Sequence, residues 1–284
     1  MEINKSLFIK ELHQITEKSY FKQFSNEYNI NILIYRNIIE DLPEIFELKN
    51  ILPKYDLSEP DFYNWSVKTM FLCKLALLTF EKRAIKNTVI NGDLIIEDNK
   101  NGTLIEGNLI VNGNIIVKGK LTVVGGVHIK GYWIDTYTDI AETAIAGNLF
   151  IEKYLLSEGN LSVGGILESP SIYLSYNQGF GTILLGCNSN IFIENDHGGS
   201  WIFGKFKTNY LIFDELKLEF EKESNLEKIM QDLSKIFQSE FISEHIKFYN
   251  LYKETNDFNI KIFWKDILNE IYEKLSEKEN IFLI

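Results

Sequence analysis

Residues 107–131 read GNLIVNGNIIVKGKLTVVGGVHIKG, a run of regular short repeats. Glycine recurs at every sixth position from Gly107 to Gly131. In each repeat, two apolar residues stand two and four places after the glycine, as Leu109 and Val111 follow Gly107. Alternation of this kind turns one side of a short strand inward and the other outward. The glycine marks a corner, because a residue without Cβ can adopt backbone dihedrals that other residues avoid.

One strand and one corner cannot bury their own apolar side, so each unit must stack on copies of itself. The repeats therefore predict a β-solenoid, a single-stranded β-helix with about six residues per side. The same alternation predicts its register. We expect Leu121 and Val123 to point into the solenoid, while Thr122 and Val124 point out.

The distribution of glycine divides the chain into three regions. All 18 glycines lie between Gly92 and Gly204, and none lies in the segments on either side. We therefore expect a helical region over residues 1–87, the β-solenoid over 88–216 and a second helical region over 217–284. The fold class is mainly β with helical flanks.

The N-terminal flank contains a helix signal at Ser58, which can act as an N-cap for a helix over residues 58–84. The centre of this helix is apolar nearly all round, so we expect it to be buried against the open first coil of the solenoid. Residues 30–42 are rich in β-branched side chains and could form either a helix or a strand.

The C-terminal flank opens with Ser224 and Glu227, a capping-box pattern that predicts a helix start. A second helix is expected over residues 260–275. The apolar residues 280–284 should pack on a helix or pair as an edge strand. If the two flanks cover the unpaired edges of the end coils, the solenoid is a monomer or a small defined oligomer.

The composition narrows the range of partners. The net charge of −11 disfavours nucleic acid, which is best met by a basic surface, and favours a basic protein. The sequence has neither a signal-peptide pattern nor an apolar run long enough to span a bilayer, so a soluble cytoplasmic protein is expected. Cys73 and Cys187 form no CxxC motif, and the sequence predicts no disulfide framework, metal site or cofactor.

The repeats of residues 107–131 resemble bacterial proteins of the polymer-forming cytoskeletal, or bactofilin-like, type. The later stretches GNLSVGGILESPSIYLS and NDHGGSWIFGKFKTNYLIFDE are similar to β-solenoid proteins found beside bacterial polymorphic toxins, where an immunity role is inferred. The resemblance covers about residues 89–215 and implies a right-handed solenoid of triangular cross-section. Bactofilins have short flexible tails, whereas this chain has large helical flanks, and this difference argues against polymerisation.

Signals for catalysis are few. Left-handed β-helix acyltransferases also use six-residue repeats, but their pattern resembles an apolar residue followed directly by glycine, unlike Val111-Asn112-Gly113 here. His128 alternates outward and is expected to be a surface residue. Residues 196–199 read DHGG, which fits either a base with an orienting carboxylate or, more simply, a turn. We therefore expect a protein that is not an enzyme.

Residues 132–142 interrupt the six-residue period, and loops on rigid scaffolds often carry function. This stretch combines aromatic side chains, which are enriched in interfaces, with acidic ones that would steer a basic partner. It is the candidate partner-binding site, with residues Tyr132, Trp133, Asp135, Tyr137, Asp139 and Glu142. The alternative is a looped-out coil whose aromatic side chains pack on a helical flank.

These observations lead to a functional hypothesis. The chain is expected to be an immunity protein that neutralises a cognate protein toxin by direct binding, without nucleic acid or membrane as a partner. The alternative is a self-assembling scaffold of the bactofilin kind, and a β-helix acyltransferase is a distant third.

Overall fold

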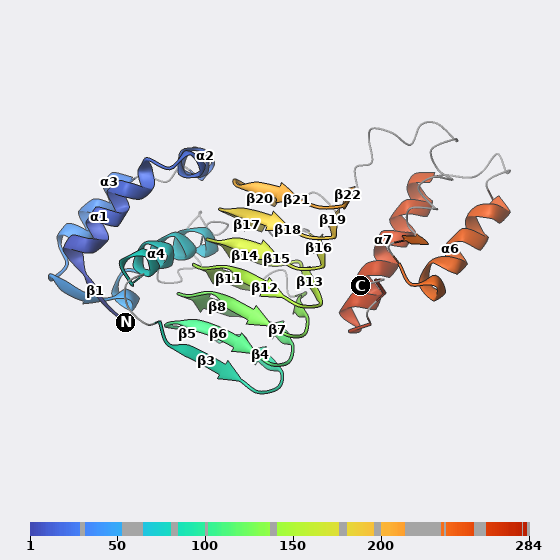
Figure 1. Cartoon of the computed structure of the whole chain (residues 1–284), viewed down its shortest axis with the longest axis horizontal. Coiled ribbons are helices and arrows are strands. Elements are labelled where there is room, and N and C mark those ends of the chain that lie inside the picture. The colour runs from blue at the N-terminus through green and yellow to red at the C-terminus, as the bar shows by residue number, and fades with distance from the viewer. Residues whose placement is uncertain are drawn as a thin grey trace.

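The fold is seen in a computed structural model of the chain. It describes residues 1–28, 32–52, 65–80, 85–99, 102–136, 141–175, 181–195, 200–213, 234–235, 237–252, 260–279 and 281–282. A central stack of short strands lies between two groups of helices (Figure 1). The predicted β-solenoid with helical flanks is therefore confirmed.

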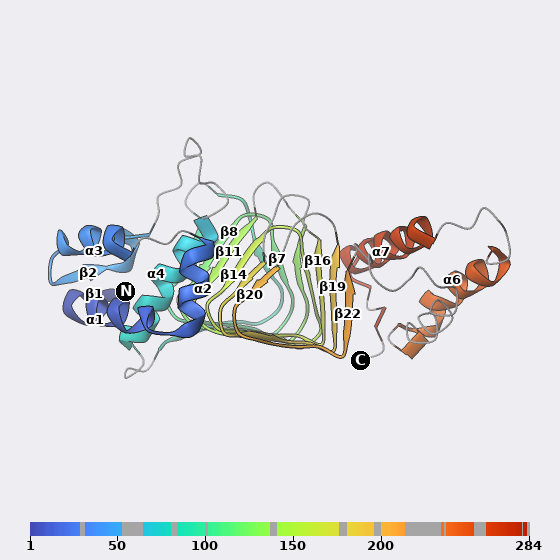
Figure 2. The ribbon, with the colours of Figure 1, turned by 90° about the horizontal axis from the view of Figure 1, so that it is seen from above.

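Three parallel sheets form the solenoid, and successive strands pass from one sheet to the next (Figure 2). The first sheet contains β3 (Asn87–Ile90), β6 (Asn108–Val111), β9 (Val127–Ile129), β12 (Leu149–Ile151), β15 (Ile166–Glu168), β18 (Gly186–Asn188) and β21 (Lys205–Lys207). The second contains β4 (Leu94–Ile96), β7 (Ile115–Val117), β10 (Trp133–Asp135), β13 (Tyr154–Ser157), β16 (Ser171–Ser175), β19 (Ile191–Asn195) and β22 (Tyr210–Phe213). The third contains β5 (Thr103–Ile105), β8 (Lys120–Val123), β11 (Glu142–Ile145), β14 (Asn160–Val163), β17 (Gly181–Ile183) and β20 (Ser200–Ile202).

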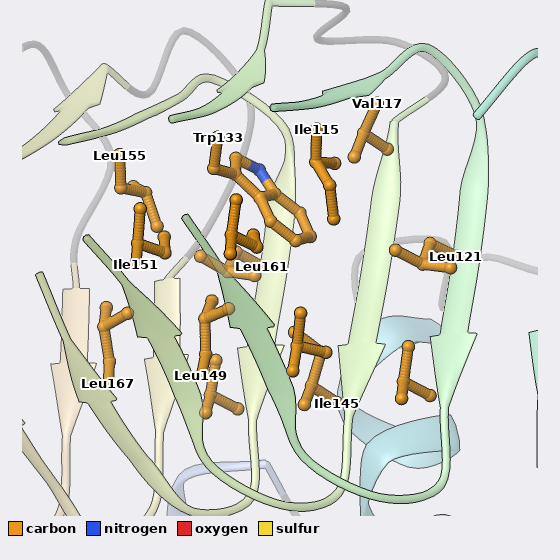
Figure 3. Close-up of a cluster of buried hydrophobic side chains, with 14 of the residues drawn as sticks. Ile115, Val117, Leu121, Trp133, Ile145, Leu149, Ile151, Leu155, Leu161 and Leu167 are labelled. Atoms are coloured by element: carbon orange, nitrogen blue, oxygen red, sulfur yellow. The ribbon is translucent and has the colours of Figure 1, made fainter. Parts of the chain in front are cut away.

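The predicted register is confirmed by the packing of the interior. Leu121 and Val123 are fully buried in a cluster of Val, Leu and Ile side chains from all three sheets (Figure 3). Thr122 and Val124 point out of the solenoid, as predicted, yet both are also buried. Val124 belongs to a second cluster that includes the N-terminal helices. The outer surface of the third sheet is therefore an internal interface.

The glycines of the repeat allow the coils to approach each other closely. A Cβ added at Gly125 would lie 2.4 Å from Asn108 Oδ1 and 2.6 Å from the backbone of Gly107, one coil earlier. Of the five glycines that mark the six-residue period, Gly107, Gly113, Gly119, Gly125 and Gly131, only Gly107 has a positive φ. The expectation that unusual dihedrals explain the repeat is therefore wrong for four of these five corners, where the backbone of the preceding coil leaves no room for a side chain.

Asparagine after glycine has a structural role in these corners. The Oδ1 atom of Asn108 accepts a hydrogen bond from the backbone N–H of Gly126 at 2.8 Å, and Asn114 Oδ1 accepts one from Tyr132 at 3.1 Å. Asn148 repeats the contact with Ile166 at 2.9 Å. Each side chain satisfies a corner N–H of the next coil that the strand ladders leave free.

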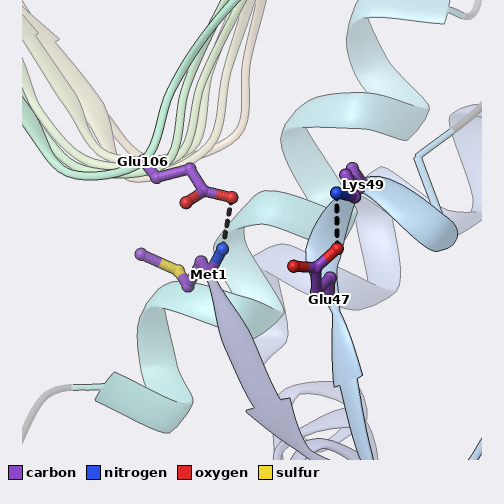
Figure 4. A network of polar contacts seen from close by, with 4 residues as sticks. All are labelled: Met1, Glu47, Lys49 and Glu106. Carbon is purple, nitrogen blue, oxygen red and sulfur yellow. Dashed lines mark hydrogen bonds and ion pairs between the residues drawn. The ribbon is translucent and has the colours of Figure 1, made fainter.

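The N-terminal flank contains β1 (Glu2–Asn4), α1 (Lys5–Thr16), α2 (Ser19–Glu27), α3 (Ile32–Glu40), β2 (Ile45–Glu47), the 3₁₀ helix η1 (Leu48–Asn50) and α4 (Trp65–Phe80). α4 is the helix expected over residues 58–84, of which residues 58–64 and 81–84 lie outside the described ranges. Its apolar centre packs on β11, β14 and β8 of the third sheet. The strand pair β1–β2 lies beside it, where the amine of Met1 forms an ion pair with Glu106, and Lys49 pairs with Glu47 (Figure 4).

The C-terminal flank contains α6 (Ser239–Tyr252) and α7 (Ile260–Ser276). The hydroxyls of Tyr154 and Tyr173, on the outer surface of the second sheet, donate hydrogen bonds to the carbonyls of Leu275 and Leu268, each at 3.0 Å. Phe282 forms an antiparallel bridge with Phe237, so the C-terminal end pairs as expected. The predicted capping box at residues 224–227 lies outside the described ranges.

Both flanks lie against the sides of the solenoid (Figures 1 and 2). We expected them to cover the end coils. Among the described residues, the outer edges of the first and last coils instead pair with no further strand. No helix in the described ranges combines the length and apolar character needed to cross a membrane.

Candidate functional site

The aromatic-acidic stretch predicted to bind a partner begins with a regular strand, β10. Trp133 pairs in register with Ile115 of β7 and Leu155 of β13, and its side chain is fully buried in the solenoid interior (Figure 3). It occupies the inward position that Ile and Leu hold in neighbouring coils. Trp133 is therefore a core residue, and its place in the apolar column is the sequence signal for this role.

Tyr132 lies at the outer surface of the second sheet but is only 7% exposed. Its ring stacks on Tyr154 at 5.1 Å between centroids, within the cluster that includes the C-terminal helices. This contact matches the alternative considered above, in which an aromatic side chain of the stretch packs on a helical flank.

Asp135 is fully buried and continues the inward-facing column of β10. Ser157 Oγ donates a hydrogen bond to Asp135 Oδ2 at 3.3 Å. A Cβ added at Gly159 would lie 2.6 Å from the same carboxylate oxygen, so the glycine provides the space that this carboxylate occupies. The burial of Asp135 is incompatible with a steering charge on the surface.

Glu142 is buried at the junction between the third sheet and α4. Its Oε1 lies 3.5 Å from Lys120 Nζ, and this ammonium lies 4.5 Å from the ring centroid of Trp65. The hydroxyls of Ser66 and Ser162 make a hydrogen bond beside the pair at 3.0 Å. Cation–π and charge-assisted contacts therefore compensate in part for the burial of the two charges.

Burial shifts the titration of both members of this pair. Desolvation raises the pKa of Glu142 to about 7, against the opposing effect of Lys120 and a hydrogen bond from the Ser66 backbone. Desolvation also lowers the pKa of Lys120, while Glu142 and Asp98 act in the opposite direction. The raised pKa of Glu142 predicts that this junction responds to pH near neutrality.

The predicted site residues thus do not form one exposed surface. Tyr132 faces the C-terminal flank, Trp133 and Asp135 face the solenoid interior, and Glu142 faces α4. Tyr137 and Asp139 lie outside the described residues. Direct contact between a partner and the four described side chains would require the flanks or the coils to open.

Exposed apolar side chains instead gather at the two ends of the solenoid. Six strands form the sheet edges, and each of them carries one large hydrophobic residue that is at least 37% exposed. These residues are Val89, Ile95 and Leu104 in the first coil, and Trp201, Phe206 and Leu211 at the other end. The sequence does not predict this pattern, because its helical flanks are expected over both ends.

The outer surface of the first sheet carries the predicted surface histidine. His128 is half-buried, and its Nε2 lies 2.9 Å from Glu152 Oε1, while its ring contacts Phe150 edge to face. Glu152 lies on the following coil, so stacking of the coils supplies an acidic neighbour that the local sequence lacks. The pair is a surface contact, as predicted for His128.

The described residues hold no cluster of three or more His, Cys, Asp or Glu side chains suited to a metal ion. Cys73 and Cys187 are buried thiols, and burial raises the pKa of Cys187 to about 12, which disfavours the reactive thiolate. The DHGG stretch of residues 196–199 lies outside the described ranges.

Comparison of the chain with protein-family models, with curated proteins and with solved structures finds no significant match.

Proposed function

We propose that this chain is a non-catalytic, protein-binding β-solenoid that receives its partner at an open end. The observation that carries this proposal is the exposed hydrophobic residue on every one of the six edge strands. Exposed edge strands with apolar side chains pair readily with another chain, and proteins that keep such edges usually protect them or use them.

The most specific form of the proposal is an immunity protein that binds a cognate toxin and occludes its active site or substrate surface. The similarity of the later repeats to β-solenoid proteins found beside polymorphic toxins supports this form. The net charge of −11 supports a basic partner.

Co-expression tests this form directly. If the adjoining gene encodes a secreted protein with a variable C-terminal domain, that domain should arrest growth when produced alone, and this chain should restore growth. Purified chain and domain should form a complex in calorimetry. A domain that remains toxic and does not bind the chain would contradict the immunity proposal.

A second candidate function is self-assembly, with the last coil of one copy stacked on the first coil of the next. The uncovered edges at both ends favour it, since stacking would bury Phe206 and Leu211. Light scattering distinguishes the two functions. Extended polymers that dissociate when Leu211 is replaced by Lys would support self-assembly, and a monomer at all concentrations would contradict it.

A further inference from the structure

We propose that the open edge of β4 binds an extended, basic segment of the partner protein, which adds to the second sheet as one further strand. This inference rests on the proposed protein-binding function and names the surface and the chemistry of the segment. Three features of the first coil carry it: free backbone groups, an exposed apolar side chain and flanking carboxylates.

Only alternate residues of β4 direct their backbone N–H and C=O groups to the neighbouring strand β7. The N–H of Leu94 donates to Asn114 at 2.8 Å, and the carbonyl of Ile96 accepts from Lys118 at 2.8 Å, so both residues face β7. Alternate residues of a strand direct their N–H and C=O groups to opposite sides. The N–H and C=O of Ile95 therefore point to the open edge, where no strand of the described ranges pairs. An incoming strand would satisfy both groups.

The side chain of the same residue offers an apolar contact. Ile95 is 48% exposed and heads an outward column that continues through Ile116 to Ile134. Ile134 belongs to the cluster covered by the C-terminal helices, whereas Ile116 is only partly buried. The bare part of this column is thus continuous with an interface that the chain already uses.

Carboxylates stand at both ends of β4. Asp93 precedes the strand, and Glu97 and Asp98 follow it, all three exposed. Asp93 accepts two hydrogen bonds from Asn114, each at 2.9 Å. Glu97 forms an ion pair with Lys118 at 3.3 Å. The charge of Asp98 attracts the ammonium of Lys120. Among the described residues around β4, three acids stand against one partly exposed and one buried lysine, which is an excess of negative charge. Such an edge repels a second acidic strand and attracts a basic one.

A second copy of this chain fits the edge less well. If the sheets continued through a stacked dimer, β22 would lie against β4. The sequence of β22 is YLIF, without a basic residue, and Asp214 follows it. β22 itself would then offer these carboxylates no positive partner, because the lysines of the last coil, Lys205 and Lys207, lie on β21, which would face β3. The charges therefore favour a basic segment from another protein.

A short synthetic peptide of two lysines, three valines and two lysines tests the proposal in an NMR titration of the full chain. We expect the amide signal of Ile95 to shift, with an affinity that falls as salt is added. The matched peptide with glutamate in place of lysine should bind at least about tenfold more weakly. Methylation of the central valine nitrogens should abolish binding, because it removes the donors that a strand needs. Equal binding of the lysine and glutamate peptides, or none by the lysine peptide, would overturn the proposal.

Two variants make the test specific to β4. Ile95→Lys should abolish peptide binding, whereas the control Phe150→Lys, an exposed apolar residue on an inner strand, should leave it unchanged. Circular dichroism should show that both variants fold. A toxin domain that binds Ile95→Lys as tightly as the wild type would overturn the role of β4 while leaving the proposed function intact. Oligomers of the wild type that Ile95→Lys dissociates would make a second copy the occupant and also overturn it.

Discussion

At the residue scale, the strand period decides which side chains matter for folding. Leu149 and Phe150 are neighbours in β12, yet Leu149 is fully buried in the interior and Phe150 is 37% exposed on the outer surface. We expect Leu149→Asp to lower the free energy of unfolding by more than about 3 kcal/mol, because it removes packing and buries a charge. Phe150→Asp should cost about 1 kcal/mol or less.

Urea denaturation of these two variants measures the difference. Equal midpoints would contradict the register of the coils. Thr122 is not a suitable surface control, because α4 covers it and Asp at that position would also be buried.

Glu142 predicts a pH dependence with a definite sign. Its pKa is about 7 in the folded chain against an ordinary value of 4.5, so the folded state binds the proton more tightly than the unfolded state. The stabilising contribution is full below pH 4.5 and is lost as the pH rises through about 7, by at most about 3 kcal/mol.

Replacement of Glu142 by Gln isolates this contribution. The stability of the wild type relative to Glu142→Gln should fall between pH 5 and pH 8 in urea titrations. Other carboxyls with raised pKa values, such as Glu158 and Glu194, are present in both proteins and cancel in the comparison. Parallel pH profiles for the two proteins would rule out a titrating Glu142.

At the scale of single elements, the corners are held by close contact between successive coils. We expect Gly125→Ala to destabilise the chain by more than about 2 kcal/mol, because its Cβ would meet the backbone of Gly107. Gly92 has a φ of +106° and open space around it, so Gly92→Ala should cost only the backbone strain of about 1–2 kcal/mol. Thermal unfolding of both variants checks the order, and a larger loss at Gly92 would contradict it.

The sequence predicted the strands well and the helix positions poorly, for physical reasons. A strict six-residue period is a local signal, and each repeat reports its own inward and outward positions. The site of α4 is a tertiary property. Its traces in the sequence are the column of small outward residues Thr122, Ala144, Ser162 and Thr182, paired in register across four coils, and outward apolar residues such as Val124. Small residues also fit a solvated surface, so the column does not by itself identify a helix interface.

At the candidate site, too, the sequence predicts the strand but not the surfaces that pack against it. Trp133 and Tyr132 are aromatic residues in a stretch that breaks the glycine period, but β10 itself keeps its register with β7 and β13. The exposed edges could not be predicted, because a helical flank beside a solenoid can cover either its end or its side. Only the register of β4 with β7 shows which backbone groups of the first coil remain free.

At the scale of the whole molecule, the two flanks and the solenoid have different roles. The flanks cover two of the three sides and bury residues that would otherwise be exposed, such as Tyr173 and Val124. Within the described ranges, no further strand pairs with the outer edges of the first and last coils. Two of the three sides of the solenoid are therefore internal interfaces, whereas the edge strands of its end coils carry exposed hydrophobic side chains.

Native-state hydrogen exchange at β4 measures whether the first coil has an open edge. In the free chain, the amide of Leu94 should exchange slowly because it donates to Asn114, whereas the amide of Ile95 should exchange rapidly at the open edge. Addition of the basic partner domain should slow Ile95 and leave Leu94 unchanged. Strong protection of Ile95 in the free monomer would show that the edge is already covered, and would contradict an open end as the binding surface.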